Sequence, residues 1–197
     1  MRTSFVVAVT AVTAVTAVAL LPGAALAHTG HEVSGFVSGL AHPVGGADHL
    51  LAMLAVGLWA ARLGGCALWL VPLTFVTTMV LGNALALSGV SLALTEQGIG
   101  VSVVVLGLLL ACAARFATPV CMAIAGGFAL FHGLAHGAEM PLTATGFTYA
   151  AGFTLATLGL HLLGMLLGKV GDEARARLFS RVTGGAIALT GVALLAA

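Results

Sequence analysis

Charge is the first thing this chain lacks. Only 7% of its 197 residues are charged, whereas a soluble domain carries about 25%. The sequence has no Lys/Arg cluster for a phosphate backbone and no nucleotide-binding signature. Cys66, Cys112 and Cys121 lie far apart without CxxC spacing, so we expect small buried apolar residues and not a disulfide framework or a thiolate site. These absences argue against a cytosolic globule and against nucleic acid as a partner.

Hydrophobic residues make up 60% of the chain. Their long runs show no alternating polarity of the kind that a membrane β-barrel requires, so the sequence predicts an all-α membrane protein. Charged or Gly/Pro-rich breaks divide the chain after residue 43 into six apolar segments, each near the length that crosses about 30 Å of hydrocarbon. These segments are 44–62, 66–90, 98–115, 119–138, 143–168 and 179–197. The expected fold is a bundle of about six transmembrane helices.

The N-terminal residues resemble a secretory signal peptide. Arg2 precedes an apolar run over residues 5–21, and Ala25-Leu26-Ala27 supplies an A-x-A end, which is the pattern of a cleavable signal. An uncleaved first helix is the alternative, although the run is shorter than the roughly 20 residues of a span. We therefore expect a signal peptide over 1–27, an N-terminal periplasmic segment over 28–43 and a six-helix transport domain over 44–197.

Basic residues predict the orientation of the bundle. Every Lys or Arg after residue 27 falls in or beside the first, third or fifth break between segments, and the second and fourth breaks hold only Glu96 and Glu139. The positive-inside rule places the basic breaks in the cytoplasm. We therefore expect a multi-pass protein of the bacterial inner membrane with both mature termini in the periplasm.

Two polar clusters interrupt this apolar sequence. The first opens the first segment with His42, Asp48 and His49, and the second closes the fourth segment with His132, His136 and Glu139. Ionisable side chains inside hydrocarbon cost several kcal/mol each, so they usually pair, bind an ion or line a path. The predicted topology brings both clusters to the outer face, although about 90 residues separate them along the chain.

The spacing of the second cluster suits a divalent metal ion. An α-helix advances about 100° and 1.5 Å per residue, which brings His132, His136 and Glu139 to one side of one helix end. Gly133 and Gly137 leave room there for a neighbouring helix or an ion. In the first cluster, Pro43, Gly45 and Gly46 are expected to break or bend the chain just before Asp48 and His49. Imidazole and carboxylate ligands suit nickel, cobalt, zinc or iron.

Structural interpretations compete with this one. In these interpretations no metal binds: the pair Asp48 and His49 holds helices together by hydrogen bonds, and so does the second cluster. His161 alone would be an interhelical hydrogen-bond donor. Four further residues are candidates for a secondary metal site. They are His28 and His31 in a cluster that a solvated linker explains equally well, Met53 one turn after His49, and His161 deeper in the fifth segment.

Three stretches resemble signatures of the hydrogenase/urease accessory nickel permeases, the HupE/UreJ family. The stretches are His42-Pro43…Gly46-Ala47-Asp48-His49…Met53…Val56-Gly57-Leu58-Trp59-Ala60, Phe131-His132-Gly133…Ala135-His136-Gly137…Glu139, and Gly152-Phe153…Ala156-Thr157…Leu160-His161…Gly164. The likeness covers essentially the whole chain after the predicted signal peptide. It implies passage of nickel or cobalt across a bacterial inner membrane for the maturation of hydrogenase or urease.

The expected protein is therefore a permease and not an enzyme, with Ni²⁺ (or Co²⁺) as its cargo and no resident cofactor. Its expected partners are the metal ion and the lipid bilayer, and a homo-oligomer or a downstream metallochaperone is compatible with the sequence. The expected entry site consists of His42, Asp48, His49, His132, His136 and Glu139. An intramembrane zinc-dependent hydrolase and a non-transporting metal sensor are the alternatives from other classes.

Overall fold

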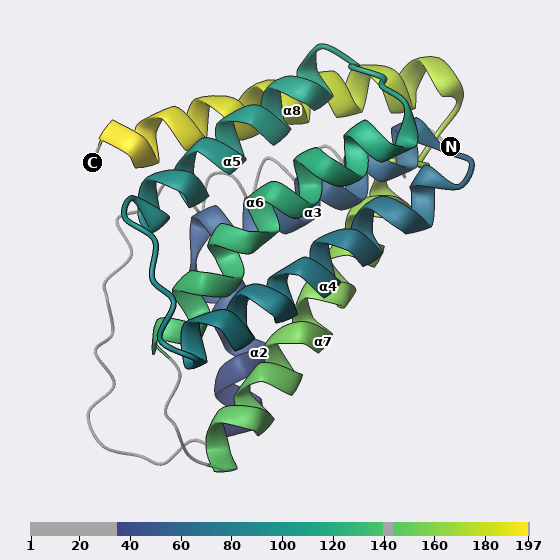
Figure 1. The fold of residues 1–197 in the computed structure, drawn as a ribbon. Coiled ribbons are helices and arrows are strands. Elements are labelled where there is room, and N and C mark those ends of the chain that lie inside the picture. The colour runs from purple at the N-terminus through teal and green to yellow at the C-terminus, as the bar shows by residue number, and fades with distance from the viewer. Residues whose placement is uncertain (1–34, 140–143, 197) are drawn as a thin grey trace.

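The computed structural model describes residues 35–139 and 144–196 (Figure 1). The predicted signal peptide, His28 and His31 lie outside these residues. Each predicted apolar segment corresponds to one helix of the structure, and one more helix precedes them. The helices are α2 (Gly35–Gly45), α3 (Ala47–Leu63), α4 (Ala67–Leu87), α5 (Thr95–Ala111), α6 (Thr118–Glu139), α7 (Ala144–Leu167) and α8 (Glu173–Ala196). The all-helical prediction is confirmed for the described residues.

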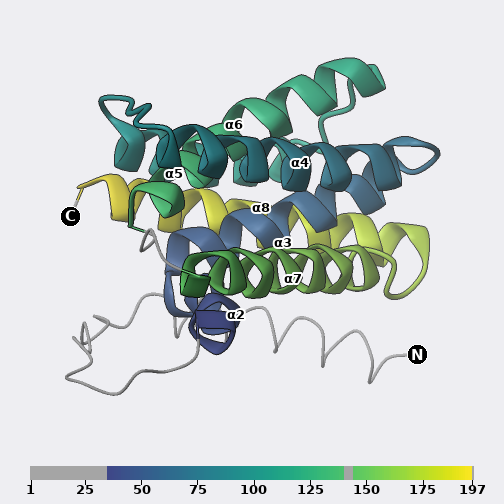
Figure 2. The same cartoon turned by 60° about the horizontal axis from the view of Figure 1, so that its bottom comes forward.

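Helix α3 lies at the centre of the bundle. Every residue from Leu51 to Ala60 is buried, as expected for a helix that is apolar all round. Around it, α4 packs on α6, α5 on α8, and α7 on α3 itself (Figures 1 and 2). The central position of α3 matters for the site, because its first turn carries Asp48 and His49.

Helix α2 was not predicted as a separate element. Residues 35–43 belong to the stretch that the sequence indicated as a segment leading into the membrane, and they form a helix that packs along α7 (Figure 2). Gly39 permits this contact, because a Cβ there would lie 2.0 Å from the carbonyl oxygen of Tyr149. The predicted break is present at Gly46, where α2 and α3 meet at 80°.

Helices α4 and α6 also approach closely. A Cβ on Gly133 would lie 2.1 Å from the carbonyl oxygen of Met79, and one on Gly137 would lie 2.5 Å from that of Asn83. The prediction that these glycines leave room for a neighbouring helix is confirmed, and the neighbour is α4. Small residues at such contacts let helix backbones approach each other within a membrane.

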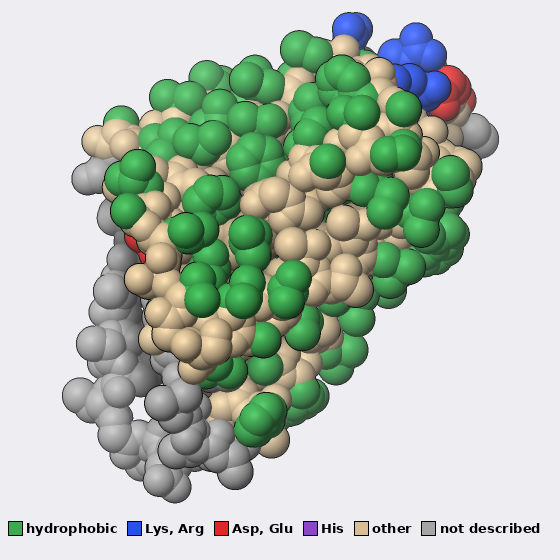
Figure 3. Space-filling view, in the orientation of Figure 1, with side chains coloured by type: hydrophobic (Ala, Val, Ile, Leu, Met, Phe, Trp, Pro, Cys, Tyr) green, Lys and Arg blue, Asp and Glu red, His purple; other side chains and the backbone are tan. Residues whose placement is uncertain are grey.

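The surface and the helix lengths identify a multi-pass membrane protein. Large apolar side chains cover the face seen in Figure 3, and many are exposed, including Phe147 at 78% and Leu189 at 73%. Four helices of the described residues (α4, α6, α7 and α8) are long and apolar enough to cross a membrane. The bent pair α2 and α3 makes a fifth span if it is counted as one, and α5 has 17 residues and is shorter. The predicted number of six crossings therefore remains a prediction.

Basic side chains gather at one end of the bundle. Arg115 donates to the carbonyl oxygen of Arg62, Arg62 pairs with Glu173, and Arg181 donates to the carbonyl oxygen of Ala111. Figure 3 shows the blue Lys and Arg side chains at the corner where these helix ends meet. We call this region the basic end. The first, third and fifth breaks of the sequence meet at this end, and these are the breaks that the positive-inside rule assigned to one side of the membrane.

One expectation about cysteine is partly wrong. Cys121 is a buried free thiol, but Cys66 and Cys112 are exposed. Both exposed residues lie at helix ends, Cys66 before α4 and Cys112 after α5. An apolar sequence environment did not indicate burial there, because it does not report which side chains the other helices cover.

Candidate metal site

The two polar clusters come together in the structure. His42 in the last turn of α2, His49 in the first turn of α3, and His132 and His136 in the second half of α6 form one group of side chains. Between ring centroids, His49 lies 4.8 Å from His132 and 4.4 Å from His136, and His42 lies 4.7 Å from His136. We call these four residues the histidine cluster. Residues about 90 positions apart thus meet within the bundle.

Asp48 fixes the ring of His49. Its Oδ1 accepts the backbone N–H of His49 at 2.7 Å and lies 2.6 Å from the Nδ1 of the same residue. Because an ionised carboxylate only accepts, the Nδ1–H of His49 donates to it. The lone pair of the imidazole is then on Nε2, which is buried without a hydrogen-bond partner in the structure. A carboxylate that orients the far nitrogen of a metal-ligating histidine is a common supporting contact.

Ser102 of α5 fixes the ring of His132 in a similar way. Its hydroxyl donates to the carbonyl oxygen of Ile99 at 2.6 Å and lies 3.0 Å from the Nε2 of His132. Since the single hydroxyl proton goes to Ile99, the serine oxygen accepts the Nε2–H of His132. The lone pair of His132 is therefore on Nδ1, which is buried and without a hydrogen-bond partner.

Unsatisfied ring nitrogens set this region apart. His136 is 2% exposed, and neither of its ring nitrogens has a hydrogen-bond partner; the same holds for His161 at 1%. A buried polar atom left unsatisfied costs about 1–3 kcal/mol, and each one in a native structure requires an explanation. A bound cation would satisfy several of these nitrogens, because the donor set is the one that borderline divalent metals take.

The rings are not arranged as a finished coordination sphere. Among the residues that the structure describes, no three His, Cys, Asp or Glu side chains converge as metal ligands. The rings of the histidine cluster meet edge to face, with interplanar angles of 63–88°. Glu139 ends α6, and its side chain lies outside the described part. Coordination would thus require ring rotation, which favours a transient site over a closed structural one.

His161 is a further buried histidine that is not part of the histidine cluster. The ring of Phe75, from α4, contacts histidines of both kinds, with its centroid 5.6 Å from that of His132 and 5.2 Å from that of His161. Phe75 is fully buried. Met53 is also fully buried and belongs to the hydrophobic core. The structure therefore links His161 to His132 through the ring of Phe75 and packs Met53 in the hydrophobic core, while metal binding by His161 or Met53 stays a prediction.

Two residues of this region were missed by the sequence interpretation, Ser102 and Phe75. Ser102 has a signal in the sequence, because it is the only polar side chain between Gln97 and the end of α5, and intramembrane polar residues usually have a partner. Phe75 has no such signal, since an apolar residue in an apolar segment is unremarkable without its neighbours.

Comparisons with known proteins agree with this architecture. The family described as HupE / UreJ protein matches residues 16–194. Protein HupE of Rhizobium leguminosarum bv. viciae is 45% identical over 175 residues, which cover 89% of this chain and 92% of that protein. No solved structure matches the chain. A match over nearly the whole length, together with the multi-pass helical fold, identifies this chain as a member of the HupE / UreJ family.

Proposed function

We propose that this protein is a permease that carries Ni²⁺, or the chemically similar Co²⁺, across a bacterial inner membrane for the maturation of hydrogenase or urease. The observation that carries the proposal is the histidine cluster, in which helices α2, α3 and α6 bring four imidazoles together inside an apolar bundle. Membership in the HupE / UreJ family supports nickel as the cargo. The position of the basic end supports entry from the opposite, periplasmic side.

Capture would begin at His49 and His132. Their hydrogen bonds to Asp48 and Ser102 leave one lone pair on each ring, Nε2 of His49 and Nδ1 of His132. The hydrated ion exchanges water for these nitrogens and for the rings of His136 and His42, which turn toward it. The Asp48 carboxylate lowers the cost of bringing a dication into a region of low dielectric constant.

Release from the cluster would follow a path toward His161. A conducting site must bind strongly enough to admit the ion and weakly enough to let it leave. The ring of Phe75 contacts both His132 and His161, so it borders a direct path of the ion between them. We propose that Phe75 limits passage between an outer station and a deeper station at His161.

The test is uptake of radioactive nickel by proteoliposomes containing the purified full chain. His49→Ala and His132→Ala are expected to lower uptake at least tenfold while the protein still inserts. Thr190→Val is the control, since Thr190 is buried, donates to the carbonyl oxygen of Ala186 in its own helix and lies in α8. Wild-type uptake by both histidine variants would overturn the proposal.

Flux also separates the competing classes of function. A transporter moves labelled ion without any reactant, a metal sensor binds the ion without accumulating it, and an intramembrane hydrolase requires a substrate to show activity. Parallel measurements with Ni²⁺, Co²⁺ and Zn²⁺, with and without a pH gradient, report the selectivity and any coupling to protons.

A further inference from the structure

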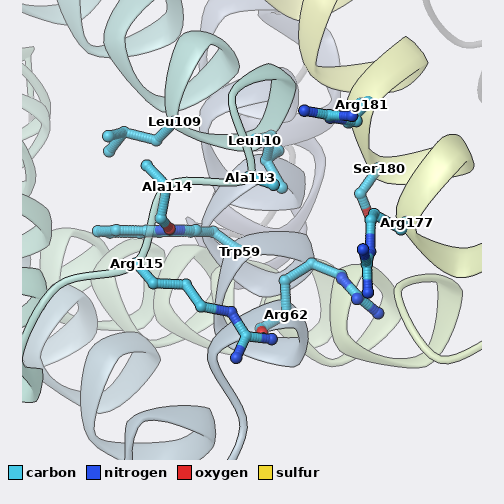
Figure 4. Close-up of a pocket in the computed structure, with 10 residues that line it drawn as sticks. All are labelled: Trp59, Arg62, Leu109, Leu110, Ala113, Ala114, Arg115, Arg177, Ser180 and Arg181. Atoms are coloured by element: carbon cyan, nitrogen blue, oxygen red, sulfur yellow. The ribbon is translucent and has the colours of Figure 1, made fainter. Parts of the chain in front are cut away.

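A cavity lies at the basic end of the bundle, at the opposite end of α3 from His49 (Figure 4). Its volume is about 320 Å³, within the range of about 300–1,000 Å³ typical of small-molecule sites. The C-terminal ends of α3 and α5, the chain that follows α5, and the first turns of α8 surround it. Its charged lining consists of four arginines, Arg62, Arg115, Arg177 and Arg181.

Two of these arginines are held in place by helix ends. Arg115 donates its Nη2–H to the carbonyl oxygen of Arg62 at 2.9 Å, and Arg181 donates its Nε–H to the carbonyl oxygen of Ala111 at 3.3 Å. Cations are favoured at C-terminal helix ends, which explains where these side chains lie. Each bond occupies one of the five N–H donors of a guanidinium, so helix capping does not account for the others.

The charges around the cavity are not balanced. Glu173 pairs with Arg62 and, at 3.5 Å, with Arg177. Within the described residues, no carboxylate pairs with Arg115 or Arg181. Four guanidinium groups against one carboxylate leave an excess of three positive charges around one cavity. Arg115, Arg177 and Arg181 are exposed, so an anion can reach them from the membrane surface.

We propose that this cavity binds the phosphate group of an anionic ligand, carried by a phospholipid headgroup or by a soluble molecule. Planar guanidinium groups bind phosphate oxygens in pairs, which a lysine cannot do. Basic pockets between transmembrane helices on the cytoplasmic side are suited to anionic headgroups. Leu109 and Leu110 add apolar surface to the same lining (Figure 4). The site is independent of the proposed metal transport.

The test measures thermal unfolding of the purified full chain in neutral detergent. One arm titrates phosphatidylglycerol against phosphatidylcholine, and the other titrates inorganic phosphate against chloride at equal ionic strength. We expect a saturable rise of the unfolding midpoint with a phosphate-bearing anion. A rise with phosphatidylglycerol alone assigns the site to a lipid headgroup, and a rise with inorganic phosphate as well assigns it to a soluble ligand. No saturable rise in either arm overturns the proposal.

Variants then locate the binding. The double variant Arg115→Gln/Arg181→Gln is expected to raise the half-saturating concentration at least tenfold. The matched control Lys169→Gln/Arg175→Gln removes two charges from the same end outside the cavity lining, and we expect a change of less than twofold. Equal losses in both would show a diffuse charge effect and overturn the proposal.

A third variant keeps every arginine in place. Ala113 lines the cavity, so Ala113→Glu introduces a carboxylate that competes with the ligand for the guanidinium groups. It is expected to weaken binding at least tenfold as well. This variant decides the matter if the double arginine variant does not fold, and unchanged binding would refute the proposed location.

Discussion

Replacing Ser102 by alanine removes the contact that orients His132. The serine oxygen lies 3.0 Å from the Nε2 of His132, and both side chains are completely buried. Alanine fills nearly the same space but cannot accept the Nε2–H, so this group becomes an unsatisfied buried donor, at a cost of about 1–3 kcal/mol. The ring is then free to turn or to change tautomer, and Nδ1 is no longer held as the nitrogen with the lone pair.

Loss of a contact that orients a metal ligand typically lowers metal affinity about 10–100-fold, or roughly 1.4–2.7 kcal/mol. We therefore expect the nickel concentration at half-maximal uptake into proteoliposomes to rise at least tenfold in Ser102→Ala. The measurement is the initial rate of uptake against nickel concentration, with the amount of inserted protein determined in parallel.

Ser180 provides a matched control for this change. It is 2% exposed, and its hydroxyl donates to the carbonyl oxygen of Ala176 in its own helix, as that of Ser102 does to Ile99. Ser180→Ala therefore loses the same intrahelical bond without touching a histidine. If both variants shift the half-maximal concentration equally, or neither shifts it, then Ser102 does not act through His132 and the reasoning is refuted.

Three further outcomes are expected. Asp48→Asn, which removes the charge that fixes the His49 ring, should lower uptake at low nickel about tenfold or more; unaltered uptake would contradict that role. Gly133→Ala places a Cβ 2.1 Å from the carbonyl oxygen of Met79 and should destabilise the protein by about 1–3 kcal/mol. Gly127→Ala, with no atom within 4 Å, should leave the melting midpoint unchanged, and equal shifts would refute the packing argument. Because only neutral imidazole ligates a metal ion, uptake should fall as the external solution is made more acidic; uptake that does not depend on external pH would argue against histidine at the entry.

Much of the helical layout was predictable from the sequence. Long apolar runs separated by charged or Gly/Pro-rich breaks leave the backbone no choice but helix in a membrane, and each predicted segment corresponds to one helix from α3 to α8. Helix α2 was missed because glycine and proline lower helix propensity in solution. Its helical form is stabilised by packing on α7, through the contact at Gly39.

The candidate site was predictable in its residue types and in its convergence. His42, Asp48, His49, His132 and His136 are rare polar residues in an apolar chain, and the alternation of basic breaks indicated that both clusters lie at one end. The structure brings the histidines together, while binding of metal by these residues stays a prediction. The burial of Cys66 and Cys112 was wrongly predicted, since an apolar sequence environment does not report which side chains the other helices cover.

The sequence by itself determined three properties of this protein. It is a helical membrane protein, a few identifiable polar residues lie inside its bundle, and its basic residues gather at one end. These properties follow from composition and from spacing along one helix, which act over short stretches of chain. Only the tertiary structure decided which nitrogen of His49 and of His132 carries the lone pair, that Ser102 and Phe75 border the site, and that four arginines from separate elements line one cavity. Contacts of this kind join residues on different helices, and their geometry depends on how those helices pack.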